Sequence, residues 1–322
     1  MNGLITICIP TCRRPDLLKT AIASCFRQNY RPLEILIGDD SGDNRSVETI
    51  QGLNRPDGVT VRHVTHNPPL RQARNVDWLI ANLRGSRLLL LHDDDLLCDN
   101  GLDKLVEAWE AESGIVCAYG KQYVLSPAGE VLPAKTEDFN RRYGRVRANR
   151  GVQESPLSAG LTQQLPNNCF LVDARLARAV GYRPEEEVGN SVDEDFGIRL
   201  GQAAGDKSFF YLDEFISCYR LTEYSILRTR HFNYGEHLLF AEVAKLDVPE
   251  RDLAARDLSL KRMSAKAVLN AAMAGHRMNA LSIFFSRHYE LRYIDIRSLF
   301  RLLYIASPRL GTRLNRLLSS TR

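Results

Sequence analysis

Three short clusters of acidic residues are the parts of this 322-residue chain best suited to chemistry. They are Asp39-Asp40, Asp93-Asp94-Asp95 and Asp193-Glu194-Asp195. Adjacent carboxylates repel one another unless something neutralises them, and a hard divalent cation would do so, with substrate phosphates completing its shell. A carboxylate can also act as a general base. The pattern indicates metal-assisted or acid–base chemistry on an anionic substrate.

Each cluster also has a structural interpretation that stays open at this point. Asp is a preferred helix-capping residue, so the first two clusters could be solvated turns that cap the following helices. The third cluster would lie in the first turn of a helix, where negative charge suits the helix dipole. The sequence contains no glycine-rich phosphate loop of the Walker or dinucleotide type. A bound diphosphate would therefore be held by the metal.

The elements that must position these clusters alternate along roughly the first 120 residues. Apolar runs predict strands at 4–9, 33–37, 59–64, 88–91 and 115–119, and helical spacing predicts helices from Pro15 and over 45–53, 70–83 and 101–112. This alternation predicts an open parallel sheet with helices on both faces. Ligands bind such sheets outside the carboxyl ends of the strands, where the first two clusters fall. Residues 120–165 lose the periodicity, which predicts an irregular excursion.

Taken in order, the motifs resemble those of family 2 glycosyltransferases. The matching stretches are Ile5–Arg14, Glu34–Ser41, Asn67 with Ala73-Arg74-Asn75, Leu91–Asp95 and Asp193–Asp195. The resemblance implies the GT-A fold, an α/β fold with a Rossmann-like nucleotide-binding mixed sheet flanked by helices and a C-terminal helical appendage. It implies a glycosyltransferase domain over residues 1–230 and a basic, mainly helical region over 231–322.

The same resemblance implies an activity. The enzyme would transfer one hexose or deoxyhexose from a nucleotide-diphosphate sugar to a hydroxyl acceptor, with inversion, in the synthesis of cell-envelope polysaccharide, lipopolysaccharide or another glycoconjugate. Neither Trp78 nor Trp109 lies in the Q-x-x-R-W motif that the family's processive synthases carry. This difference predicts transfer of a single sugar.

Roles for individual residues also follow from the resemblance. It implies nucleotide contacts from Pro10, Thr11, Arg13, Asp39, Asp40, Arg71, Arg74 and Asp93. A carboxylate at position 40 can accept a hydrogen bond from a ring N–H, which favours a uridine or thymidine donor.

Around the reacting atoms the resemblance implies three further groups. Asp94 matches the position of a ligand to Mn²⁺ or Mg²⁺, with Asp95 beside it, and Asp195 matches the catalytic base. The acceptor side is assigned to Glu194, Asn167 and Asn168.

The sequence departs from the family pattern at several positions. His92 stands where many members have an acidic residue, and Thr222 stands where many have a histidine that His231 could replace. Two alternatives stay open, a non-catalytic nucleotide-sugar-binding or scaffold member of the same fold and a nucleotidyltransferase. The latter class usually opens with a glycine-rich basic loop, which Pro10–Arg14 is not.

The charge is unevenly distributed along the chain. Residues 245–322 hold 15 Lys and Arg against 6 Asp and Glu, whereas residues 1–244 hold 28 against 33. Two accounts of the basic region stay open. It could contact anionic lipid, or it could be a helical cap packed on the catalytic domain or on a second subunit in a homodimer. The acidic body argues against a nucleic-acid partner.

The N-terminus and the apolar composition bear on where the chain resides. The first residues lack a basic region and a signal-peptide core, and no long apolar, uncharged window predicts a spanning helix. We therefore expect a cytoplasmic protein, with a place at the inner face of the membrane if the basic region binds lipid. The seven scattered cysteines form no C-x-x-C pair, so they predict neither a disulfide framework nor a zinc site.

Overall fold

The computed structural model describes residues 3–222, 235–289 and 296–312. They divide into two compact units. The first takes its described residues from Met1–Arg183 and Phe196–Arg228, and the second from Pro184–Asp195 and Thr229–Arg322. The boundary between Asp195 and Phe196 falls inside one helix, α9 (Val192–Ala203).

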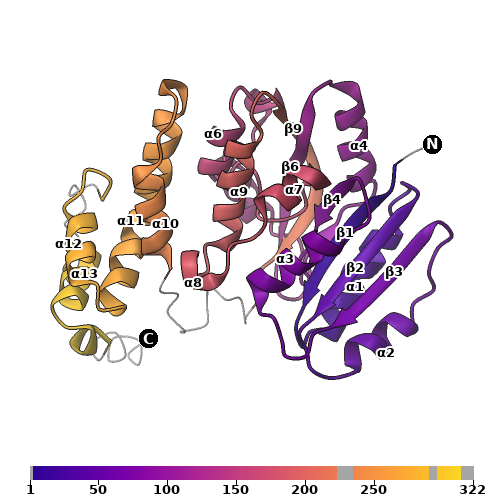
Figure 1. The fold of residues 1–322 in the computed structure, drawn as a ribbon, viewed down its shortest axis with the longest axis horizontal. Helices are drawn as coiled ribbons and strands as arrows, with labels where there is room; N and C mark the ends of the chain where they lie inside the picture. Colours follow the sequence, from indigo (N-terminus) through magenta and orange to yellow (C-terminus); the bar gives the residue numbers. More distant parts are fainter. Residues whose placement is uncertain (1–2, 223–234, 290–295, 313–322) are drawn as a thin grey trace. The chain divides into compact units, whose positions relative to one another are not determined.

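The first unit is built on a nine-stranded mixed sheet (Figure 1). Its strands are β1 (Ile5–Thr11), β2 (Leu33–Asp39), β3 (Val59–Thr65), β4 (Arg87–Leu90), β5 (Leu96–Leu97), β6 (Ile115–Leu125), β7 (Gly151–Val152), β8 (Leu171–Asp173) and β9 (Ser208–Arg220). The order is β3-β2-β1-β4-β8-β6-β9-β5, with β7 paired to β9. The first four strands are parallel, as the sequence predicts. The short β8 runs antiparallel between β4 and β6, which makes the sheet mixed.

Helices cover both faces of this sheet because its central strands are apolar on both sides. The helices of the first unit are α1 (Pro15–Phe26), α2 (Arg45–Gln51), α3 (Gln72–Asn82), α4 (Gly101–Ala111), α5 (Pro133–Arg142), α6 (Pro156–Leu161) and α7 (Ala174–Val180). Alternate side chains of a strand point to opposite faces. Ile5 and Ile7 join a core cluster with residues of α1 and α4, whereas Cys8 lies against α3, where its thiol donates to Leu79 O.

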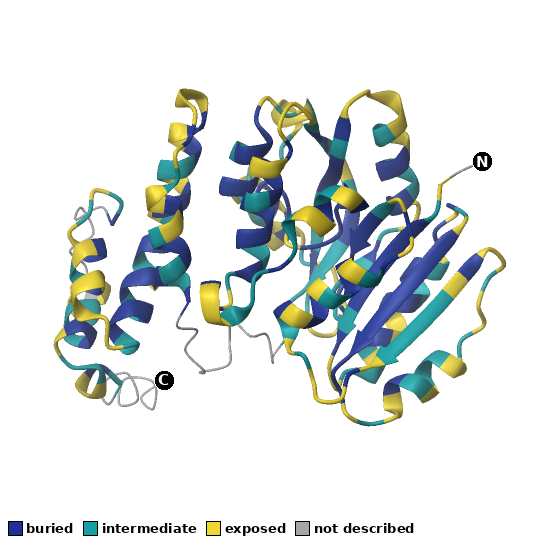
Figure 2. Ribbon diagram, in the orientation of Figure 1, coloured by how far each residue is buried: buried dark blue, intermediate teal, exposed yellow. Residues whose placement is uncertain are grey.

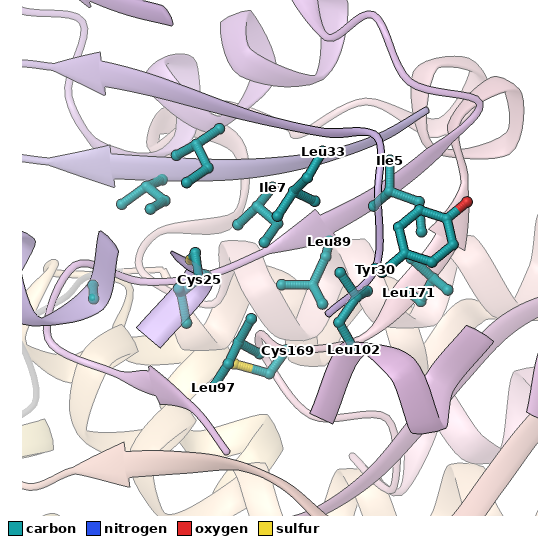
Figure 3. Close-up of a cluster of buried hydrophobic side chains, with 14 of the residues drawn as sticks. Ile5, Ile7, Cys25, Tyr30, Leu33, Leu89, Leu97, Leu102, Cys169 and Leu171 are labelled. Atoms are coloured by element: carbon teal, nitrogen blue, oxygen red, sulfur yellow. The ribbon is translucent and has the colours of Figure 1, made fainter. Parts of the chain in front are cut away.

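The core between α1, α4 and the sheet is almost entirely aliphatic. Ile7, Leu33, Leu89 and Leu171 come from four different strands and are all fully buried (Figure 3). All seven residues of β2 are buried, and Figure 2 shows the central strands in the colour of buried residues. Burial of this kind supplies most of the favourable free energy of folding. It holds the carboxyl ends of β1, β2 and β4 in fixed positions.

The prediction of an irregular excursion over 120–165 is wrong. β6 continues to Leu125, and α5 and α6 follow. The side chains that α5 buries, Thr136 and Asn140, are polar and not apolar. Asn140 accepts from Gln122 N at 3.1 Å and donates to Gln122 O at 2.8 Å. Hydrogen bonds therefore attach α5 to β6, and no apolar stripe marks this helix in the sequence.

The second unit is helical in its described part. It contains α8 (Glu185–Val188), α10 (Glu236–Lys245), α11 (Leu253–Met273), α12 (Arg277–Phe284) and α13 (Ile296–Ala306). A Cβ added to Gly189 would lie 2.1 Å from Gly235 Cα, so these two glycines allow α8 and α10 to meet. None of the described helices is long and apolar enough to cross a membrane. His231 and the end of the basic region, residues 313–322, lie outside the described residues.

Candidate active site

Two of the three acidic clusters meet at the carboxyl end of β1. The Thr11 hydroxyl donates to Asp93 Oδ2 at 2.8 Å, and Thr11 O accepts from Asp40 N at 2.9 Å. Thr11 also pairs with Asp39 in the parallel register of β1 and β2. One residue thus joins the loop after β2 to the loop after β4, where parallel sheets bind ligands. Pro10, half-buried, precedes it and pairs with Gly38.

Asp39 and Asp40 have different environments although they are adjacent. Asp39 is fully buried, accepts from Ser41 N at 2.8 Å and contacts His63 Nε2 at 3.1 Å. Burial opposes its ionisation, but the hydrogen bonds from His63 and Ser41 prevail and lower the pKa of Asp39. Asp40 accepts from Leu70 N at 3.0 Å, which connects it to the residue before Arg71. Asp39 therefore stabilises the loop, and Asp40 links it to the segment that precedes α3.

The arginines assigned to the nucleotide lie at the surface around this loop. Arg13 is exposed and has a positive φ of 58°, and its backbone N donates to Ser41 Oγ at 2.8 Å. Arg71, with a φ of 69°, and Arg74 are exposed at the start of α3. The hydrogen bond from Leu70 to Asp40 brings this turn to the Asp40 loop.

Arg14 is a site residue that the sequence analysis did not single out. Its Nη1 lies 3.2 Å from Asp93 Oδ1 and 2.9 Å from Asp94 Oδ2. Arg14 is half-buried immediately before α1, which begins at Pro15 because proline is well suited to the first helical position. The requirement for a cation beside three successive carboxylates is the signal that could have found it.

A group of possible metal ligands lies in the loop after β4. Ligand atoms of His92, Asp94 and Asp95 all lie within 4.8 Å of one another. Asp95 is buried, and its two oxygens accept from Arg220 N at 2.8 Å and from Asn168 Nδ2 at 2.7 Å. Carboxylate donors suit Mn²⁺ or Mg²⁺, and outer hydrogen bonds of this kind orient metal ligands. The two predicted ligands therefore fit a divalent cation, and His92 lies beside them.

The buried carboxylates of this loop hold their protons more tightly than usual. Burial raises the pKa of Asp93 to about 6, although Arg14 and Thr11 oppose the shift. Burial and the neighbouring Asp94 raise the pKa of Asp95. Burial is the main cause of both shifts and the neighbouring Asp94 adds to them, and a bound cation would oppose them.

The residues assigned to the acceptor side and to the base are distributed between the two units. Asn167 is exposed, whereas Asn168 is buried and donates to Asp95 Oδ2 and His92 Nδ1, so its side chain lies against the possible metal ligands. Glu194 and Asp195 lie in the first turn of α9 and belong to the second unit. Asp195 is buried, and its backbone N donates to Ser191 O at 2.8 Å. Its assignment as the base stays a prediction.

Comparisons with known proteins connect this site to one family. Residues 6–152 match the family described as Glycosyl transferase family 2. A Campylobacter jejuni protein named GalNAc(5)-diNAcBac-PP-undecaprenol beta-1,3-glucosyltransferase is 26% identical over 116 residues, which are 36% of this chain and 37% of that protein. The match thus covers little more than a third of the relative's length.

Two solved structures share the fold. TarS from S. aureus, in complex with UDP-GlcNAc, matches with a TM-score of 0.62 and 12% identity, covering 94% of this chain and 79% of that chain. The mannosyltransferase PcManGT from Pyrobaculum calidifontis, in complex with GDP-Man and Mn²⁺, matches with a TM-score of 0.57 and 13% identity, covering 96% and 88%. The predicted GT-A fold is thereby confirmed.

Proposed function

This chain belongs to glycosyl transferase family 2, and from that membership we propose that it is an inverting enzyme that transfers one hexose or deoxyhexose from a nucleotide-diphosphate sugar to a hydroxyl acceptor. The observation that carries the proposal is the group formed by His92, Asp94 and Asp95, next to the loop that Thr11 joins to Asp40. A nucleotide at the Asp40 loop would place its diphosphate near these carboxylates. The arrangement suits a nucleotide-diphosphate sugar.

Different residues of the chain would bind the metal, the base and the ribose in such a transfer. Asp94 and Asp95 would hold Mn²⁺ or Mg²⁺, which when bound offsets the charge that develops on the departing diphosphate, and His92 lies beside them. Asp40 would accept from the base, and Arg13, Arg71 and Arg74 would contact the nucleotide. Asp93, held by Thr11 and Arg14, faces the same loop and would contact the ribose.

The reaction itself needs a base on the acceptor side. Asp195 would take the proton of the acceptor hydroxyl while that oxygen bonds to the anomeric carbon. The bond from the anomeric carbon to the diphosphate oxygen breaks with its electron pair going to the nucleoside diphosphate. Attack from the opposite face inverts the configuration. Glu194 and Asn167 would border the acceptor.

The names of the relatives support a donor class and an acceptor class without distinguishing members of either. The TarS complex holds UDP-GlcNAc, which agrees with a uridine donor, whereas the PcManGT complex holds GDP-Man. The Campylobacter relative is named for an undecaprenol diphosphate saccharide. A saccharide carried on a lipid diphosphate at the inner face of the membrane is the acceptor class that we favour, in the assembly of a cell-envelope glycan.

The test is release of nucleoside diphosphate from a panel of UDP-, dTDP- and GDP-sugars, with Mn²⁺ or with EDTA. We expect one donor to be hydrolysed or transferred only with the metal. Asp94→Asn should abolish this turnover, whereas Asp99→Asn, which alters an exposed carboxylate paired with Arg27 outside the site, should not. Binding of a donor without turnover, with or without saccharide acceptors, would identify a non-catalytic member and overturn the proposal.

A further inference from the structure

Arg145 is a buried cation of the first unit. It is 3% exposed, and its guanidinium lies 5.3 Å from the ring centres of both Phe139 and Tyr143. In the described part of the chain it has no carboxylate partner, and burial lowers the pKa of Arg145 to about 10. The side chain therefore stays charged at neutral pH. Burying a charge without a counter-ion costs free energy. The hydrogen bonds of Arg145 must therefore offset this cost.

Every hydrogen bond of this guanidinium goes to an oxygen acceptor. Nε donates to Gln164 O at 2.9 Å, Nη2 donates to Gln163 O at 3.1 Å, and Nη1 donates to Gln122 Oε1 at 3.1 Å. A guanidinium has donors and no acceptor. Gln122 must therefore turn its carbonyl oxygen, and not its amide nitrogen, toward Arg145.

The orientation of the Gln122 amide determines the orientation of the Asn168 amide. Its Nε2 faces away from Arg145 and donates to Ser217 Oγ at 3.1 Å and to Asn168 Oδ1 at 3.4 Å. Asn168 must then present its Nδ2 on the far side, where it donates to Asp95 Oδ2 at 2.7 Å and to His92 Nδ1 at 2.9 Å. All the donors in this series of hydrogen bonds point away from Arg145.

The two final acceptors are residues of the possible metal group. Asp95 accepts through a carboxylate oxygen, and His92 accepts through an Nδ1 that carries a lone pair, so its ring proton lies on Nε2. A metal ligand must offer a lone pair and not a proton. Asp95 keeps further carboxylate lone pairs for a cation, whereas the one ring lone pair of His92 is taken by Asn168, so Asp95 is the ligand that this arrangement serves. With the Asn168 amide reversed, its oxygen would face the Asp95 carboxylate oxygen and repel it.

We propose that Arg145 is a positioning residue for the divalent-cation site, acting through Gln122 and Asn168 to hold Asp95 and His92 as hydrogen-bond acceptors. The inference rests on the proposed function, because it concerns the cation of the same site. Arg145 contacts neither the substrate nor the metal. The Arg145 guanidinium can only donate hydrogen bonds. Each following donor, first Gln122 and then Asn168, must therefore point away from Arg145 and toward Asp95.

The decisive variant is Gln122→Glu. A carboxylate at 122 still accepts from Arg145 but cannot donate to Asn168 Oδ1, so the Asn168 amide turns over and its oxygen faces Asp95. We expect the Kd for Mn²⁺, measured by electron paramagnetic resonance of free Mn²⁺ with and without UDP, to rise about 10- to 100-fold, the usual cost of losing an outer-shell partner of a metal ligand. Arg145→Gln, which no longer imposes a direction, should also weaken Mn²⁺ binding.

A matched control separates the direction of the hydrogen bonds from the added charge. Gln164 is buried beside Arg145, with its own side chain bonded to Tyr119 and Gly144 O. Gln164→Glu adds the same carboxylate near Arg145 but leaves Gln122 and Asn168 unaltered, so the Kd for Mn²⁺ should stay within about twofold of wild type. An equal loss in both variants would mean that charge is the cause, and it would overturn the inference.

A spectroscopic measurement reports the same arrangement without the metal. In ¹⁵N-histidine-labelled protein, the His92 resonance, assigned by its loss in His92→Gln, should show an unprotonated Nδ1 in the wild type and a protonated Nδ1 in Gln122→Glu. Unchanged Mn²⁺ affinity and an unchanged His92 spectrum in Gln122→Glu would refute the inference alone. Failure of the wild type to bind Mn²⁺, with or without UDP, would refute the metal part of the proposed function as well.

Discussion

Arg14 Nη1 lies 2.9 Å from Asp94 Oδ2, so a cation of the chain itself already contacts the carboxylate assigned to the metal. The same nitrogen reaches Asp93 Oδ1 at 3.2 Å. Arg14 therefore neutralises part of the acidic loop before any metal arrives. It competes with a metal ion for Asp94, and this competition can be measured.

Replacing Arg14 by glutamine should tighten Mn²⁺ binding. The substitution removes a positive charge next to the ligand oxygen, and a partly solvated pair of this kind is worth about 1 kcal/mol, or roughly a fivefold change in Kd. Isothermal titration with MnCl₂ provides the measurement. Arg27→Gln is the matched control, because Arg27 forms an exposed ion pair with Asp99 outside the site. Weaker Mn²⁺ binding in Arg14→Gln would show that Arg14 positions Asp94 and does not compete with the metal.

Asp195→Asn should remove catalysis while donor binding survives. A positioned general base contributes about 10²- to 10⁴-fold to the rate, and the donor contacts are assigned to other residues. The measurement is the transfer rate together with the Kd for UDP. Asp193→Asn changes the same charge in the same helical turn and should keep most of the activity. Near-wild-type transfer by Asp195→Asn would remove Asp195 from the mechanism.

The stability of the metal-free protein should depend on the protonation of Asp93. Its folded pKa of about 6 lies above the ordinary 3.8, so the folded state binds the proton more tightly than the unfolded state. The contribution of Asp93 is therefore fully present below about pH 4 and is lost as the pH rises through about 6. The loss amounts to at most about 3 kcal/mol, since one pKa unit corresponds to about 1.4 kcal/mol.

Thermal denaturation in EDTA across this pH range measures the effect. The Tm of the wild type, relative to that of Asp93→Asn, should fall between about pH 4 and pH 6. Adding Mn²⁺ should reverse the fall, because a metal ion favours the ionised site. A difference between the two proteins that does not vary with pH would contradict the assignment of the shift to Asp93.

The basic region, residues 245–322, should bind anionic vesicles if it contacts lipid. Leu299 is 58% exposed and Leu310 is 52% exposed, in a region rich in arginine. We expect the full chain to sediment with vesicles containing phosphatidylserine and not with phosphatidylcholine alone, and the binding should weaken as salt is added.

Two substitutions test whether these leucines take part. Leu299→Asp with Leu310→Asp should reduce sedimentation several-fold, since both apolar contact and charge attraction are lost. Val131→Asp is the control, because Val131 is 47% exposed but belongs to the first unit. Equal sedimentation of all three proteins would leave the helical cap or a second subunit as the account of this region.

Much of the fold could be predicted because it depends on local patterns. The apolar runs at 33–37 and 88–91 became buried strands, and α1 begins at Pro15 as expected. The helix α5 could not be predicted in this way, because the side chains that it buries are Thr136 and Asn140. Their partners on β6 are distant in sequence, and hydrogen bonds between distant residues leave no periodic signal.

The sequence by itself determined the order of strands and helices over roughly the first 120 residues and the place of Asp39, Asp40 and Asp93–Asp95 at the ends of strands, because periodicity and turn chemistry act over a few residues. Only the tertiary structure decided which side chains meet there. It selected Arg14 as the cation beside Asp94, placed His92 beside the possible ligands, and joined Asp95 to Asn168. These contacts depend on the register of β1 with β2 and β4 and on the way the chain returns through β8 and β9, which no local pattern encodes.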